Sequence, residues 1–84
     1  MSMEQIARTP QQLGAALRRR RRELGWTQKE LAGRVRLRPA TISELEAGEV
    51  DARLSTVTRL MAALDLEVLV RPRTRGENQL AELF

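Results

Sequence analysis

Apolar residues recur every three or four positions through most of the chain, which is the spacing of one face of an α-helix. The first such run includes Leu13 and Leu17. It begins at Thr9, a residue type that caps helices, and the proline after it suits a first helical turn. It stops at Gly25, a common helix terminator. We therefore predict a helix over residues 10–24.

The same spacing and further capping residues predict three more helices. Thr27 followed by Glu30 three residues later forms a capping-box pattern, which is typical of a helix start. Pro39 suits the first turn of another helix, and Ser55 is the expected N-cap of the last. The predicted helices span residues 28–35, 39–47 and 55–64.

The pattern changes period after the last helix. Residues 66–71, Leu-Glu-Val-Leu-Val-Arg, have strand composition and are stopped by Pro72, so they form the one strand candidate. A single strand cannot satisfy its backbone hydrogen-bonding groups within its own fold. The simplest partner is the same strand of a second copy. We therefore predict a homodimer whose contacts are made by Leu66, Val68, Leu69 and Val70.

Residues 27–47 contain two short predicted helices joined by about three residues, which is the pattern of a helix-turn-helix motif. Ala32 occupies the position where two such helices cross closely, because a larger side chain would separate them. The predicted fold class is all-α, a domain of four to five helices over residues 9–72. One C-terminal β-strand, at 66–71, pairs across the homodimer in this prediction.

The two ends of the chain are predicted to be flexible, over residues 1–8 and 73–84. Two interpretations of the C-terminal tail stay open. It is either a disordered segment or a short apolar face that docks into a partner protein, and both hold if the tail orders on binding. The docking residues would fall at helical spacing, at Leu80, Leu83 and Phe84.

Composition excludes several kinds of chemistry. The 84 residues contain no Cys and no His, which rules out disulfides, thiolate or imidazole metal sites and Ser-His-Asp catalysis. We expect no metal, cofactor or small-molecule ligand and no enzymatic activity. No apolar run approaches the ~20 residues that span a bilayer, and the first residues do not resemble a signal peptide. We therefore expect no membrane partner and a location in the prokaryotic cytoplasm, at the nucleoid.

The charge is unevenly distributed along the chain. Lys and Arg number 15 and Asp and Glu 11, for a formal net charge of +4. Ten basic and three acidic residues in 1–38 give 10 − 3 = +7, and five basic and eight acidic residues in 39–84 give 5 − 8 = −3. A cationic N-terminal half predicts a polyanionic partner on one face.

Two segments carry a resemblance to a known family. The residues Gly-Trp-Thr-Gln-Lys-Glu-Leu-Ala at 25–32 and Ala-Thr-Ile-Ser-Glu-Leu-Glu at 40–46 resemble the XRE-type, lambda-repressor-like DNA-binding family. Within it, the chain is most similar to the HipB-type antitoxins, which share the Gly-Trp-Thr-Gln entry, the Ala-Thr-Ile-Ser segment and a terminal strand. The resemblance covers about residues 9–71.

The resemblance implies roles for individual residues. Gln28 matches the residue that holds a phosphate and braces the second helix of the motif. Arg21 and Glu46 match a partly buried ion pair that ties the first helix to the end of the third. The positions that face the major groove are matched by Arg38, Ala40, Thr41 and Ser43.

Two residues depart from the family pattern. Arg36 stands at the turn position where glycine is usual, so either the turn differs or Arg36 is strained. Pro39 stands where a base-reading polar side chain is common, so one contact is lost and base discrimination shifts toward Arg38. The arginine fork of Arg38 suits guanine O6 and N7.

Several cations are expected around this DNA face, each with a plainer alternative. The five arginines at 18–22 point in every direction around a helix, so they form either a mostly solvated face or one or two phosphate contacts. Trp26 is expected in the core rather than stacked on bases. The set of predicted DNA contacts is completed by Thr27, Lys29, Arg34 and Arg53, as phosphate contacts or solvated side chains.

The resemblance implies a function as well. We expect a homodimer on a palindromic operator, with half-sites about 34–36 Å apart. It would repress its own operon and neutralise a HipA-like serine/threonine kinase toxin by binding it. Two alternatives stay open: a stand-alone repressor without a toxin partner, and a basic structural or RNA-binding adaptor.

Overall fold

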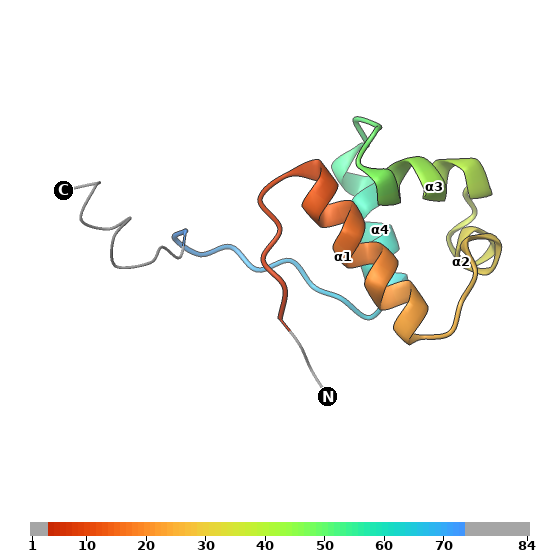
Figure 1. The fold of residues 1–84 in the computed structure, drawn as a ribbon, viewed down its shortest axis with the longest axis horizontal. Helices are drawn as coiled ribbons and strands as arrows, with labels where there is room; N and C mark the ends of the chain where they lie inside the picture. Colours follow the sequence, from red (N-terminus) through yellow and green to blue (C-terminus); the bar gives the residue numbers. More distant parts are fainter. Residues whose placement is uncertain (1–3, 74–84) are drawn as a thin grey trace.

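A computed structural model describes residues 4–73, and its folded part consists of four helices (Figure 1). The helices predicted over residues 28–35 and 39–47 are confirmed at both ends. The first helix ends one residue earlier than predicted, and the last begins and ends one residue earlier. The bounds are α1 Pro10–Glu23, α2 Gln28–Val35, α3 Pro39–Ala47 and α4 Leu54–Ala63.

The predicted caps hold at the first two helices and fail at the last. The Thr9 hydroxyl accepts a hydrogen bond from the Gln12 amide at 3.0 Å at the start of α1. At α4, the residue that caps the helix is Arg53 and not Ser55, and its side chain makes no capping hydrogen bond. The Arg53 carbonyl already accepts bonds from the amides of Thr56 and Val57, so Ser55 lies inside the first turn.

The core is built from one fully buried side chain of each helix and the residues around them. Leu17, Leu31, Ile42 and Leu60 come from α1 to α4 in order, and each is at most 2% exposed. α2 packs against both α3 and α4, while α1 packs against α3 (Figure 1). Within residues 4–73, this arrangement leaves the outer face of α3 without a helix over it. None of the helices within residues 4–73 is long and apolar enough to cross a membrane.

α1 and α3 approach each other at Gly14. This glycine is buried, and a Cβ atom built on it would overlap the backbone carbonyl oxygens of Leu45 and Glu46. The absence of a side chain therefore lets the two backbones touch, and it brings the end of α3 against the middle of α1. A glycine inside a run of good helix formers is the sequence signal for such a contact.

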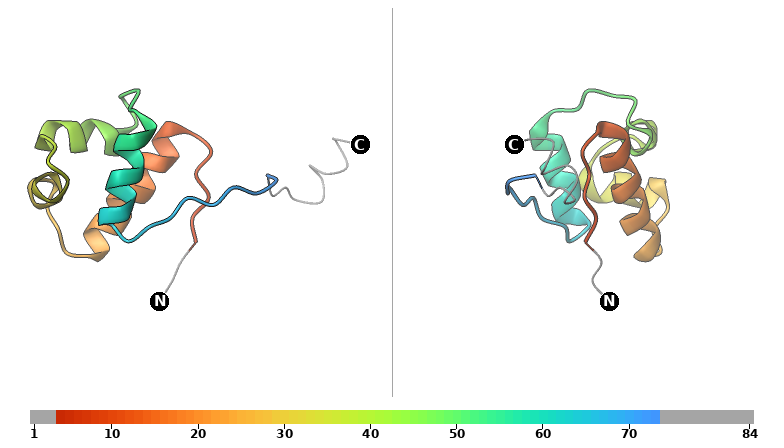
Figure 2. Two further views of the ribbon diagram at one scale, coloured as in Figure 1. Left: turned by 180° about the vertical axis from the view of Figure 1, so that it is seen from behind. Right: turned by 60° about the vertical axis from the view of Figure 1, so that its left-hand side comes forward.

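The chain after α4 leaves the helical domain in an extended conformation (Figure 2). α4 ends in a Schellman motif, in which the amides of Asp65 and Leu66 bond back to the carbonyls of Ala62 and Met61. Residues 66–71 form no strand within the described part of the chain, because a ladder needs a second strand beside it and this fold offers none. Their pairing across a homodimer stays a prediction.

Replacing Gly14 with alanine should destabilise the fold although alanine is the better helix former. The overlap with the α3 carbonyls should cost about 1–3 kcal/mol, as overpacking does, and outweigh the helix-propensity gain of about 1 kcal/mol. The matched control is Gly33→Ala in α2, where a Cβ meets nothing within 4 Å and should stabilise by about 0.5–1 kcal/mol. Urea unfolding of both variants measures the difference, and a Gly14 variant stabilised as much as the Gly33 variant would contradict the close contact.

Candidate nucleic-acid interface

The turn between α2 and α3 is closed by a left-handed residue. Arg36 has φ 58° and ψ 45°, a left-handed conformation that favours glycine. Of the two alternatives for this position, a different turn or a strained arginine, the structure therefore has the strained arginine. The next amide, of Leu37, bonds back to the Ala32 carbonyl at 3.0 Å. Ala32 is 1% exposed, as the predicted close crossing of the two helices requires. The turn ends at Arg38, which is the N-cap of α3.

The outer face of α3 begins at this turn. Arg38, Pro39, Ala40 and Ser43 are all exposed, as a groove-facing surface requires, whereas Thr41 is half-buried. Pro39 has no backbone N–H group and no polar side chain. In the predicted set on α3, the exposed side chains that can form hydrogen bonds are therefore Arg38 and Ser43.

Sequence analysis missed one exposed polar residue on α3. Glu44 lies one helical turn after Ala40 and is exposed on the same helix. A carboxylate in a major groove can accept a hydrogen bond from the amino group of cytosine. The sequence signal that could have identified Glu44 is its spacing of four residues from Ala40, which places both residues on one face of the helix.

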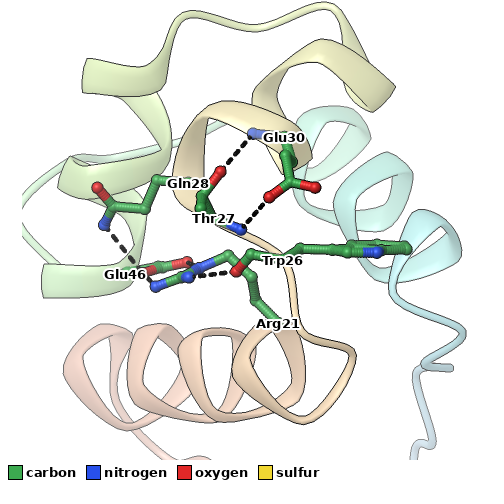
Figure 3. Close-up of polar contacts among 6 residues, drawn as sticks. All are labelled: Arg21, Trp26, Thr27, Gln28, Glu30 and Glu46. Atoms are coloured by element: carbon green, nitrogen blue, oxygen red, sulfur yellow. Dashed lines mark hydrogen bonds and ion pairs between the residues drawn. The ribbon is translucent and has the colours of Figure 1, made fainter.

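A buried ion pair holds the end of α3 against α1 (Figure 3). Arg21 Nε and Nη2 donate to the two carboxylate oxygens of Glu46 at 2.7 and 3.0 Å. The side chains are 8% and 4% exposed, so the pair that the resemblance implied is present and is more buried than expected. The hydrogen bond to Glu46 raises the pKa of Arg21, although burial acts in the opposite direction.

Two further hydrogen bonds extend this ion pair to the start of α2. Arg21 Nη1 donates to the Trp26 carbonyl at 2.7 Å, and Gln28 Nε2 donates to Glu46 Oε1 at 3.1 Å (Figure 3). Gln28 therefore braces α3, which is half of the role implied for it. Its contact with a DNA phosphate stays a prediction.

The start of α2 is closed by the predicted capping box. The Thr27 hydroxyl accepts from the Glu30 amide at 3.0 Å, and the Glu30 carboxylate accepts from the Thr27 amide at 3.1 Å (Figure 3). The hydrogen bond that the Thr27 amide donates to the carboxylate is the main cause of a lowered pKa of Glu30. Thr27 thus acts as a helix cap, and Lys29 is exposed in the first turn beside it.

Trp26, which precedes α2, contacts Arg34 in the last turn of that helix. The Arg34 guanidinium lies 4.0 Å from the centre of the Trp26 ring, a cation–π contact. The indole is half-buried against the core, which agrees with the core position expected for it. Arg34 is also exposed, so its contact with a DNA phosphate, one of the two alternatives for this residue, stays a prediction.

Arg20 makes a contact that nothing in the sequence indicated. Its Nε donates to the Leu64 carbonyl at 2.9 Å, so α1 caps the C-terminal end of α4. A side chain that reaches a backbone carbonyl 44 residues away leaves no periodic signal.

The other predicted site residues are distributed as follows. Arg53 is exposed at the start of α4. Leu66 is half-buried against the core, whereas Val68, Leu69 and Val70 are 59%, 69% and 91% exposed, and the dimer contacts of all four residues stay a prediction. The tail residues predicted to dock a partner lie outside the described part of the chain, namely Leu80, Leu83 and Phe84.

Comparison with known proteins agrees with this geometry. The sequence profile of a helix-turn-helix family matches residues 17–70. The chain therefore belongs to the XRE-type helix-turn-helix family.

Two curated relatives are both called Antitoxin HipB. The one from Escherichia coli O6:H1 (strain CFT073) is 32% identical over 82 residues, covering 98% of this chain and 86% of the relative. The one from Escherichia coli K12 is 35% identical over 68 residues, covering 81% and 76%. Among solved structures, a chain in the HipA-HipB-O2-O3 complex matches with a TM-score of 0.75 and 31% identity, over 84% of this chain and all of that one.

Removing either member of the buried pair should be far more costly than removing both. Arg21→Met or Glu46→Leu leaves one uncompensated buried charge and should each cost about 3–5 kcal/mol. The double variant replaces the pair by apolar groups and should lose much less than the sum. A double-mutant cycle measured by urea unfolding gives the coupling, and single-variant losses below about 1 kcal/mol would instead describe a surface pair.

Proposed function

We propose that this protein is a homodimeric antitoxin that binds palindromic operator DNA and represses its own operon. The observation that carries the proposal is the exposed outer face of α3, held in place by the buried pair of Arg21 and Glu46. A rigid, uncovered helix with short side chains at its start is what entry into a major groove requires. Such a repressor works in the prokaryotic cytoplasm, at the nucleoid.

The side chains of the interface have distinct tasks in this proposal. Arg38 and Ser43 read base edges, with Ala40 and Thr41 packed beside them. Phosphates are held by the start of α2, through Gln28 and Lys29, and by Arg53 at the start of α4. The polarity of these groups matches their targets, because cations and helix N-termini suit phosphates and arginine forks suit guanine.

The second part of the proposal is a protein partner, a HipA-like serine/threonine kinase that the antitoxin neutralises by binding. This part rests on the two relatives called Antitoxin HipB and on the similarity to HipB in a complex with HipA. It is tested by searching the same operon for a kinase-like reading frame and co-purifying any such product with this chain. A chain that binds its operator but no such kinase would be a stand-alone repressor.

Substitutions on α3 and α2 should affect binding in different ways. Arg38→Ala and Ser43→Ala should weaken binding to a palindrome selected from a random library by about 1–3 kcal/mol per lost base contact, and leave random duplex unaffected. Gln28→Ala should weaken both alike. Affinities are measured at about 150 mM salt, because salt sets the non-specific background. An unchanged ratio of the two affinities in Arg38→Ala would remove Arg38 from base reading, and equal wild-type affinities for both duplexes would refute sequence-specific binding.

The dimer is proposed to form through the extended segment after α4. Val68, Leu69 and Val70 expose apolar surface along backbone that has no partner within the described chain. Val68→Asp should therefore give a monomer by light scattering. The control is Leu54→Asp, because Leu54 is also a large exposed apolar residue, at 74%, but lies on α4. A dimer mass retained by the Val68 variant would refute strand pairing.

A further inference from the structure

The five consecutive arginines of α1 have different environments. Arg21 is bound to Glu46, and Arg20 donates to the Leu64 carbonyl. Arg19 and Arg20 both lie 3.8 Å from the carboxylate of Glu23. Within residues 4–73, three of the five guanidinium groups therefore have partners.

The two remaining members of the run are Arg18 and Arg22. Both are exposed, and neither guanidinium forms a hydrogen bond or ion pair with the described residues. They are four residues apart, so they stand next to each other on one face of α1. This face carries two uncompensated positive charges in adjacent turns.

The position of this face follows from the contacts of α1. Gly14 and Arg21 point toward α3, and Leu17 points into the core. Successive residues advance by about 100° around a helix. Arg18 and Arg22 therefore lie about 50° and 90° round from the α3 contact, on the side away from the core.

The exposed face of α3 is located in the same way, from its contacts and the rotation per residue. Glu46 points toward α1, and Ile42 and Leu45 point into the core. Ser43 and Ala47 then lie about 60° to 100° round, again on the side away from the core. Because the core lies on one side of the α1–α3 contact, the exposed faces of both helices lie together on the other side.

A shallow open hollow connects the two helices on this side. Arg18, Arg22 and Ala15 line it from α1, and Glu46 lines it from the last turn of α3. Arg19 and Glu23 line it too, but they pair with each other and add no net charge. Glu46 is neutralised by Arg21, so the charge that remains at the hollow is that of Arg18 and Arg22.

We propose that Arg18 and Arg22 bind backbone phosphates of the same DNA whose major groove α3 enters. This inference rests on the proposed function and extends the DNA interface onto α1. Two arguments favour DNA as the occupant: the charge is uncompensated and positive, and the face is continuous with the exposed side of α3. Long arginine side chains on a neighbouring helix can reach the strand that borders the groove, where phosphates are the exposed groups. Such contacts hold the DNA without reading its sequence.

The test compares Arg18→Gln, Arg22→Gln and the double variant with Arg59→Gln, which removes an exposed arginine of α4 outside the hollow. Affinity is measured for the selected palindrome and for random duplex over a range of salt concentrations. Each lost phosphate contact lowers the slope of log K against log salt by about 0.9, so the double variant should lose about 1.8. It should bind both duplexes on the order of 50-fold more weakly at 0.1 M salt, with an unchanged ratio between them. The Arg59 variant should retain the wild-type slope.

Several results would overturn the inference. A double variant with the wild-type slope would show that the two arginines are only solvated. A fall in the ratio of palindrome to random affinity would show that they act on sequence, and a loss confined to kinase binding would assign the face to a protein partner. If the wild type lacks sequence preference, the proposed function fails, yet the slope on random duplex still tests the two arginines. Thermal unfolding verifies that all variants retain the fold.

Discussion

The ion pair of Arg21 and Glu46 is the contact on which the geometry of this domain depends. α3 has nine residues, too few to be stable alone, so its position is set by what holds it. Burying two charges is unfavourable unless each is paired and its other hydrogen-bonding capacity is used. Here Gln28 bonds to the carboxylate and the Trp26 carbonyl accepts from the guanidinium, so the pair is complete. One network thus fixes α1, the start of α2 and the end of α3.

Close packing of backbones makes this network possible. Gly14 brings α1 against the last turn of α3, within reach of the Arg21 side chain. At the other end of α3, the left-handed Arg36 sets the angle at which the chain turns out of α2. α3 is therefore held at its last turn by charge and at its first by the conformation of the preceding turn. Its outer face, between these two points, is free to touch another molecule.

Much of the fold could be predicted from local signals in the sequence. Thr9, Thr27 and Gly25 mark helix ends because capping is decided by residues within a few positions. The same local rule failed at Ser55, because Arg53 adopts the extended cap conformation and its carbonyl starts the helix. Contacts between distant residues were predicted only where a resemblance supplied them, as for Arg21 and Glu46. Arg20 had no such guide, and the glycine at position 14 indicates a close approach without identifying its partner. Periodicity identifies the buried face of a helix but not what that face meets.

The contact between Arg20 and the Leu64 carbonyl also has a consequence for how a dimer reads DNA. It anchors the start of the extended segment to α1, the helix that is also ion-paired to α3, so the base of the segment and α3 are held by the same helical body. Two such bodies joined through their extended segments would present their reading helices at a fixed angular phase. With 10–10.5 base pairs per turn of DNA, each added base pair rotates one half-site by about 35° relative to the other. A dimer built in this way would measure the distance between half-sites as a rotation, and the helical repeat of DNA would then be part of its specificity.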